Sequence, residues 1–594
     1  MSTAAGPSTT AGATGAGARE RLAWAAVAFL SLLVLLVASR GAPLGVPAAD
    51  DYLFLHQQRF GNPDFFGSYG AAWYWRPVSR QLYFSLLGPW LPQAAWLIPV
   101  LHGALLLVTF AALAALARRV LSPRAALVAA AFPLLVEPAR VLLSWPSASQ
   151  HLIAMAAVSS ALAAAAAGRL ALSLAAAALA LGSIETAALA LPLIPLLAPR
   201  GAAGGRSRWV IGTLALAAAW VALRVAVAAH GVRIPSGGAT PSPLAMAHAL
   251  WLGLAAQLGI EDLPAPAAAV VLAGYAAALA GAWWTSRRAA EKGARPPRVI
   301  RAWALGGLLW WTAGTLPLAG ILPNWNAWRS SLPGLGLGVA FAALFARGRA
   351  WPVLLFLAVR AGALLLASPA PALVSSQGPP TTSHLSFVRL VRLQRTLEAT
   401  RAVLLHEARP ARGGLMRYWN YPWMSEFAFA GPAAIQVWLG DPTAQWGPFG
   451  GATGFQDTTT PVIAFNPDST RLAVRIHPEA QRLLLLANQA MRAGRLVEAD
   501  AQLARALAIQ TVPSVRLRAV VLANRSAVRL SLGDLRGADS LHRAGIDAIP
   551  SIEWLREERT LALALGDTVR ARRAMMVSRQ IEGRTPGAGG APAR

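Results

Sequence analysis

The residues best suited to chemistry in this chain are carboxylates and arginines next to long apolar segments. Asp50 and Asp51 form an acidic pair, while Glu137 and Glu185 interrupt apolar sequence. Ionisable groups at or near membrane depth are costly, and they normally mark function or a buried ion pair. Carboxylates can accept a proton and arginines can bind an anion. Together they predict one site that binds an anion and transfers a proton. The candidate arginines are Arg76, Arg80, Arg140, Arg224 and Arg329.

The composition predicts that much of the chain is buried in lipid. Of the 594 residues, 56% are hydrophobic and only 13% charged, whereas soluble domains carry about 25% charged residues. The formal charge of +27 would indicate nucleic-acid binding in a soluble protein. Here most of the excess is Arg in short loops between apolar segments, so we expect no nucleic-acid partner. The chain has no cysteine, which excludes disulfides and zinc–thiolate sites.

Apolar runs long enough to span a bilayer recur along the first 370 residues. A twelfth run, 243–260, is expected to lie at the outer interface, because counting it as a span would move the basic loop 287–301 outside. The expected spans are 22–39, 94–117, 120–136, 151–168, 170–182, 184–199, 209–229, 265–285, 301–322, 332–346 and 350–368.

The basic loops predict the orientation of these spans. With a cytoplasmic N-terminus, every dense group of arginines falls on the cytoplasmic side, as the positive-inside rule requires. Eleven spans then leave the region after residue 370 outside the cytoplasm. We therefore expect a multi-pass protein of the plasma or inner membrane.

The same topology gathers the candidate residues in loops on the outer face. Each also has a structural interpretation. Asp50 and Asp51 fit a solvated helix cap, and Glu185 fits an ion pair with Arg224 or Arg140. Arg76 and Arg80 fit anchors at the interface, and the 22 tryptophans are mostly expected in an interfacial belt. No histidine pair has a metal-ligand spacing, so we expect no metal site.

The order of these pieces resembles the GT-C superfamily of integral-membrane glycosyltransferases, especially protein O-mannosyltransferase-like members with C-terminal tetratricopeptide repeats. The likeness covers about residues 20–370. Its motifs are an acidic pair, a Tyr-Arg-Pro-Leu-like segment, a glutamate followed by a tryptophan, a Ser-Lys-Glu motif, an aromatic-Leu-Arg motif and a Glu-Arg-Tyr-like stretch. They are matched by Asp50-Asp51-Tyr52, Trp75-Arg76-Pro77-Val78, Glu137 with Trp145, Ser183-Ile184-Glu185, Trp220 to Arg224, and Trp328-Arg329-Ser330.

The resemblance implies inverting transfer of a sugar from a polyprenyl-phosphate donor to a protein or glycolipid acceptor, without a cofactor. Asp50 would be the base, and Asp51 or Glu185 would position the acceptor or tune Asp50. Arg76, Arg224 and Arg329 would hold the phosphate, and Glu137 and Trp145 would complete the substrate site. The chain departs from the family pattern at Ile184, at Ser147–Gln150 and at Ser330.

The rest of the chain predicts a water-exposed tail. We expect a disordered start (1–20), the membrane domain (21–370), a mixed α/β region (371–478), helical repeats (479–580) and a disordered end (581–594). Gly494, Gly533 and Gly566 each precede an alanine by five residues, which resembles the second half of a tetratricopeptide repeat. About two and a half such repeats are expected, able to bind a partner protein.

The fold class is thus a mainly α transmembrane bundle followed by a mixed region and a tetratricopeptide-like helical array. The leading hypothesis for function is a glycosyltransferase. The alternative is a catalytically degenerate membrane scaffold that presents the repeats to partners. A transporter would be expected to show paired internal repeats, and the sequence has no convincing duplication.

Overall fold

The computed structural model describes residues 11–61, 64–67, 74–199, 205–229, 241–291, 298–322, 325–347, 349–367, 385–422, 424–449, 459–466, 471–546 and 552–584. These residues are mainly helical and include one four-stranded sheet. The chain divides into two compact units. One comprises Met1–Pro371 and Thr382–Val391, and the other Ala372–Thr381 and Arg392–Arg594.

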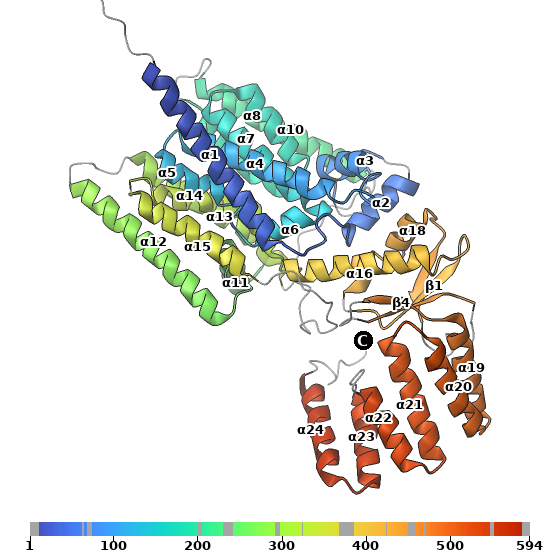
Figure 1. Cartoon of the computed structure of the whole chain (residues 1–594). Helices are drawn as coiled ribbons and strands as arrows, with labels where there is room; N and C mark the ends of the chain where they lie inside the picture. The colour runs from blue at the N-terminus through green and yellow to red at the C-terminus, as the bar shows by residue number, and fades with distance from the viewer. Residues whose placement is uncertain are drawn as a thin grey trace, which may run out of the picture. The chain divides into compact units, whose positions relative to one another are not determined.

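The first unit is helical throughout its described residues, and several of its long helices lie side by side in Figure 1. α12 packs against α15, α4 against α7, and α13 against α14. Its elements are α1 (Ala11–Ala38), α2 (Asp50–Phe60), η1 (Pro77–Leu82), α3 (Tyr83–Leu87), α4 (Leu97–Ala117), α5 (Pro123–Ala131), α6 (Pro138–Ser144), η2 (Pro146–Ala148), α7 (Ser149–Ala166), α8 (Leu170–Leu181), η3 (Glu185–Ala190), α9 (Leu193–Leu197), α10 (Gly205–Ala229), α11 (Pro243–Leu258), α12 (Ala265–Glu291), α13 (Arg298–Thr315), η4 (Leu316–Ile321), η5 (Ala327–Ser330), α14 (Ser331–Leu344) and α15 (Ala350–Leu366).

Among the residues that the structure describes, six helical segments are long and apolar enough to cross a membrane: Glu20–Ala38, Leu97–Ala117, Pro146–Ala166, Gly205–Ala228, Ala265–Arg288 and Arg298–Ile321. Four shorter apolar helices are Leu170–Leu181, Glu185–Leu197, Pro243–Leu258 and Ala350–Leu366. Of the other expected spans, 120–136 contains the nine-residue helix α5, and 332–346 contains the 14-residue α14. At 1.5 Å per residue these two helices are shorter than a hydrocarbon core of about 30 Å. The count of eleven spans therefore stays a prediction.

Glycines allow α13 and α14 to approach each other backbone to backbone. A Cβ added at Gly307 would lie 2.5 Å from the carbonyl oxygen of Gly336, and one added at Gly336 would lie 2.6 Å from that of Gly307. Small residues permit such close packing where the hydrophobic effect between helices is weak. The glycine-rich sequence around Gly336 is thus a helix-packing surface.

A fully buried arginine ties three parts of the first unit together. Arg360 on α15 donates hydrogen bonds of 2.9 Å to the carbonyl oxygens of Gln257 and Phe132. Its guanidinium also lies 3.7 Å from the centre of the Phe132 ring. Because backbone carbonyls and a ring face satisfy this cation, Arg360 has a structural role.

The second unit begins with a small mixed sheet. Its strand order is β2-β1-β3-β4, with β1 parallel to β2 and β3, and β4 antiparallel to β3. Trp419 is 8% exposed and packs in a cluster with Val462 and Leu483. The elements are α16 (Phe387–His406), which begins in the first unit, β1 (Leu415–Trp419), α17 (Ser425–Phe429), α18 (Ala433–Leu439), β2 (Gln445–Pro448), β3 (Val462–Phe465) and β4 (Ala473–Arg475).

Three helical hairpins follow the sheet, and their successive helices are labelled in Figure 1. The turns contain Gly494, Gly533 and Gly566, whose φ values of 73°, 79° and 78° favour glycine. The following alanines (Ala499, Ala538 and Ala571) are buried against the partner helices. The pairs are α19 (Pro478–Arg492) with α20 (Leu496–Ile509), α21 (Val515–Ser531) with α22 (Leu535–Ile546), and α23 (Ile552–Ala564) with α24 (Thr568–Arg584).

The chain ends differ in part from the expectation of disorder. α1 begins at Ala11, inside the expected disordered start, and α24 continues to Arg584, inside the expected disordered end. Residues 1–10 and 585–594 lie outside the described residues.

Candidate functional site

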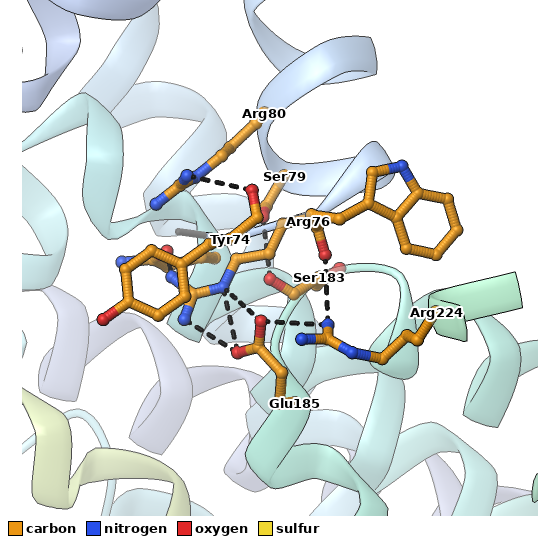
Figure 2. Close-up of polar contacts among 9 residues, drawn as sticks. Tyr74, Arg76, Ser79, Arg80, Ser183, Glu185 and Arg224 are labelled. Carbon is orange, nitrogen blue, oxygen red and sulfur yellow. Dashed lines mark hydrogen bonds and ion pairs between the residues drawn. The ribbon is translucent and has the colours of Figure 1, made fainter. Parts of the chain in front are cut away.

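Glu185 is the centre of an ion-pair cluster that joins three distant segments. Its Oε2 lies 2.7 Å from Nη2 of Arg76, and its Oε1 lies 3.2 Å from Nη1 of Arg224. Nε of Arg76 also donates to Oε1 at 3.3 Å, which makes this contact bidentate. Figure 2 shows the Glu185 carboxylate between the two guanidiniums. The structural interpretation of Glu185 as a partner of Arg224 is therefore correct, and Arg76 is a second partner.

The backbone around Arg76 is fixed against the loop that carries Glu185. The amide of Val78 donates to the carbonyl of Gly182 at 3.0 Å, and the hydroxyl of Ser79 donates to the carbonyl of Ser183 at 2.8 Å. Nη1 of Arg76 donates to Gln150 as well. The Arg-Pro segment and the Ser-Ile-Glu segment thus meet, as expected for parts of one site.

Tyr74 lies between two arginines. Its ring centre is 4.3 Å from the guanidinium carbon of Arg76 and 5.2 Å from that of Arg80. Arg80 is only 4% exposed and also stacks on Phe54 at 4.7 Å. Its guanidinium donates one long hydrogen bond, 3.4 Å, to the carbonyl of Tyr74 (Figure 2). Arg80 is therefore a buried cation within the cluster rather than an exposed interface anchor.

The two members of the acidic pair have different environments. Asp51 is fully buried at the start of α2, where its Oδ2 accepts a 2.7 Å hydrogen bond from the amide of Ala48 and its Oδ1 accepts one from the Ser147 hydroxyl. Burial raises the pKa of Asp51 to about 8. Both oxygens are engaged in holding the chain, so Asp51 is not free to meet a substrate.

Asp50 is half-buried and is surrounded by positive charge. Burial raises the pKa of its carboxyl above the usual value, while Arg80, Arg76 and Arg329 act in the opposite direction. A carboxyl with a raised pKa is a better proton acceptor near neutral pH than an ordinary aspartate. Of the two acids, Asp50 is the one suited to acid–base chemistry.

The turn before Asp50 is strained. Ala49 has φ 57° and ψ −123°, a conformation that a residue with a Cβ rarely adopts. The indole Nε1 of Trp145 donates to the carbonyl of Ala48 at 3.0 Å, and the Asp51 carboxyl binds the Ala48 amide. Trp145 and Asp51 therefore hold the backbone that places Asp50.

The turn that carries Arg329 is held from several directions. Gln257 donates to the Ser330 hydroxyl at 2.9 Å, and the Leu385 amide donates to Oδ1 of Asn326 at 2.8 Å. The Trp328 ring packs edge-on against Trp145, with centroids 5.5 Å apart. Trp145 thus contacts both the Asp50 turn and the Arg329 turn, which fixes the two candidate residues through one side chain.

Glu137 belongs to a separate group. It lies 4.0 Å from Arg140, whose guanidinium is 3.8 Å from the centre of the Phe387 ring at the start of α16. Its charge also interacts with Asp262. Glu137 is expected among the substrate-binding residues, but its charged neighbours are Arg140 and Asp262, not the Glu185 cluster.

Ser147 and Gln150 also take part in the site, and both lie in the segment that differs from the glycosyltransferase motif. Ser147 binds Asp51, and Gln150 binds Arg76. The departure itself, Ser147–Gln150 in place of a charged motif, was the signal available in the sequence. Among the described residues, no group of three or more histidines, aspartates or glutamates is placed to hold a metal ion.

No protein-family model matches the chain, and no curated protein or solved structure matches it. The contacts and charges of the site are therefore the basis for the function proposed below.

Proposed function

We propose that this chain is a membrane glycosyltransferase of the GT-C type, which transfers a sugar from a polyprenyl-phosphate donor to a protein or glycolipid acceptor outside the cytoplasm. The observation that supports it best is that one half-buried carboxyl, Asp50, interacts electrostatically with the charges of Arg76, Arg80 and Arg329. Segments far apart in the sequence supply these groups, and all lie next to apolar helices.

In the proposed reaction an acceptor hydroxyl attacks the anomeric carbon of the sugar. The new C–O bond forms as the bond from that carbon to the phosphate oxygen breaks, and its electron pair stays on the phosphate. The hydroxyl proton passes to Asp50, which acts as the general base. Arg329, with Arg76 and Arg224, would hold the phosphate, while Glu185 fixes the last two arginines.

Labelling with a panel of donors tests this proposal. Purified membranes with the parent protein or the Asp50→Asn variant would be incubated with polyprenyl phosphates carrying different radiolabelled sugars. We expect label in a macromolecular or lipid acceptor with the parent and near background with the variant. Failure of every donor, with correctly inserted parent protein, would contradict the proposal.

The alternative is a membrane scaffold that has lost catalysis. It is favoured by the Glu185 cluster, in which Arg76 and Arg224 already have a carboxylate partner, and by Ile184 in place of a basic residue. In either case we propose that the three hairpins form a tetratricopeptide-like array that binds a partner protein. Donor labelling distinguishes the two functions, because a scaffold labels no acceptor.

The proposed topology has eleven spans, a cytoplasmic N-terminus and an extracytoplasmic second unit. Since the chain has no native cysteine, single introduced cysteines report the side cleanly. We expect Val497→Cys, at a position 72% exposed on α20, to react with an impermeant maleimide in intact spheroplasts. Arg349→Cys should react only after permeabilisation. The reverse labelling pattern would overturn the orientation and the outer location of the site.

A further inference from the structure

The cluster around Asp50 and Glu185 has more positive than negative groups. Four guanidiniums, those of Arg76, Arg80, Arg224 and Arg329, are connected to it by ion pairs, ring contacts or charge interactions. Asp50 and Glu185 are the two carboxylates expected to be charged there, because the pKa of Asp51, raised to about 8 by burial, keeps that acid mainly protonated at pH 7. Four cations against two anions leave an excess of two positive charges.

Two of the four cations have no direct ion pair among the described residues. Glu185 forms ion pairs with Arg76 and Arg224. Arg80 and Arg329 have no carboxylate within ion-pair distance among the residues that the structure describes. Nε of Arg80 is buried without a hydrogen-bond partner there, and burial lowers the pKa of Arg80 to about 9. The ring face of Trp328 lies 5.2 Å from the Arg329 guanidinium.

A buried cation without a direct ion pair carries a large desolvation penalty, and for Arg80 the charge of Asp50 offsets only part of it. Aromatic faces offset part of this penalty, so Tyr74 and Phe54 only partly stabilise Arg80. A ligand with two negative charges would offset the rest. Arginine is also the side chain whose planar donors match phosphate oxygens.

We propose that this site binds a doubly charged phosphate group, with Arg80 and Arg329 as the two cations that match its charges. The inference rests on the proposed function and names the charge of its ligand. Two lipid groups have this chemistry. One is a lipid phosphate monoester, which a monophosphate donor leaves behind, and the other is a diphosphate that links lipid and sugar.

The match between the two arginine charges and the two phosphate charges affects the barrier of the proposed reaction. In a monophosphate donor the phosphate is a diester with one negative charge, and it gains a second as the bond to the sugar breaks. Cations placed for two charges interact more strongly with the departing group than with the donor. Such differential binding lowers the barrier of the chemical step. Arg80 would then stabilise the leaving group.

Binding of three synthetic probes to the purified full-length protein tests the inference. The probes are a prenyl phosphate, its methyl diester with one charge, and a prenyl diphosphate capped by a methyl group. We expect the monoester or the capped diphosphate to bind about ten- to a hundredfold more tightly than the methyl diester, the usual effect of one charge-assisted contact. The tighter of the two dianions identifies the lipid group.

Variants connect the preference to the two arginines. Arg80→Gln and Arg329→Gln should each bring the affinity for the dianion down toward that for the diester. Arg118→Gln is the matched control, because it removes one charge from a partly exposed residue that pairs with Glu20, outside the cluster. Equal affinity of the parent protein for monoester and diester would overturn the inference, as would a preference that neither site variant changes.

The pH dependence provides an internal check. A phosphate monoester has its second pKa near 6, so its affinity should fall between pH 7.5 and pH 5. The capped diphosphate keeps its charges over this range and reports any titration of the protein itself. The charged and titratable groups of the cluster are Asp50, Asp51, Tyr74, Arg76, Arg80, His151, Glu185, Arg224 and Arg329. An equal loss of affinity for both probes would contradict recognition of the second charge.

Failure of the inference and failure of the proposed function give different results. Preferred binding of dianions without transfer from any sugar donor would support the phosphate site and contradict the glycosyltransferase. Transfer from a sugar donor with equal binding of monoester and diester would do the opposite. Donor labelling and probe binding therefore decide the two claims separately.

Discussion

Asp50→Asn is expected to reduce sugar transfer by about 10²–10⁴-fold, the usual effect of losing a positioned general base. Asparagine keeps the size and hydrogen-bonding shape of the side chain but accepts no proton at neutral pH. The loss should therefore fall on kcat rather than on donor affinity. Product formation under donor saturation measures it, with surface labelling to confirm that the variant is inserted.

The pH profile of the parent enzyme gives a second reading of the same residue. Because burial raises the pKa of Asp50, activity should be lost on acidification at a pH above the ordinary carboxyl range near 4. A base works only when ionised, so the loss occurs as pH falls through this raised pKa. Unchanged turnover in Asp50→Asn would refute the assignment.

Asp51→Asn is the matched control for this prediction. An asparagine amide can donate to Ser147 and accept from the Ala48 amide, replacing both contacts of Asp51. The folded-state pKa of Asp51 is raised, so this acid favours folding in its protonated form, and that contribution is lost as pH rises from about 4 to about 8. Asp51→Asn should therefore keep most activity and lose less stability than the parent at high pH. Equal damage from both variants would mean that Asp51 also takes part in the chemistry.

Glu185→Ala is expected to destabilise the protein by about 3–5 kcal/mol, because it leaves two largely buried arginines without their carboxylate. The partial exposure of Glu185 places the effect toward the lower end of that range. The midpoint of thermal aggregation in detergent measures the change. Binding of the phosphate probes should persist, since the variant adds net positive charge to the cluster.

A double-mutant cycle separates the ion pair from other effects of truncation. Glu185→Ala combined with Arg224→Ala should cost less than the sum of the two single variants, because the double variant leaves fewer unpaired charges. Glu479→Ala is the control, since its ion pair with Arg482 lies on the surface and such pairs contribute about 0–1 kcal/mol. Additive effects of Glu185→Ala and Arg224→Ala would contradict the coupling.

Apolar composition predicts helices long enough to cross a membrane well when a run is uninterrupted, as in α4 and α12. It predicts them less well where breaks occur inside the run. The expected span 184–199 is divided into η3 and α9 on either side of Pro192. The run 120–136 is helical only over α5, which begins with Pro123 capped by Ser122 and ends at Ala131. Hydropathy is insensitive to such local changes in backbone geometry.

The sequence predicts which residues belong to the candidate site better than it predicts which of them contact each other. Charged residues within apolar sequence pointed to Asp50, Arg76 and Glu185, because burial makes such residues rare. Their contacts depend on segments more than 100 residues apart, as with Arg76 and Glu185, which no local pattern encodes. The division of the acidic pair into a buried Asp51 and a half-buried Asp50 likewise depends on Ser147 and on the turn at Ala48.

The strained conformation of Ala49 restricts the orientation of the next residue, Asp50. Glycine would adopt φ 57° and ψ −123° without a steric penalty, and alanine there has a backbone energy less favourable by about 1–3 kcal/mol. Alanine also has fewer alternative backbone states, so the residue after it samples fewer orientations. The Ala49→Gly variant should therefore still fold, but the Asp50 side chain should sample a wider range of orientations. Only some of these orientations would bring its carboxyl to the acceptor proton.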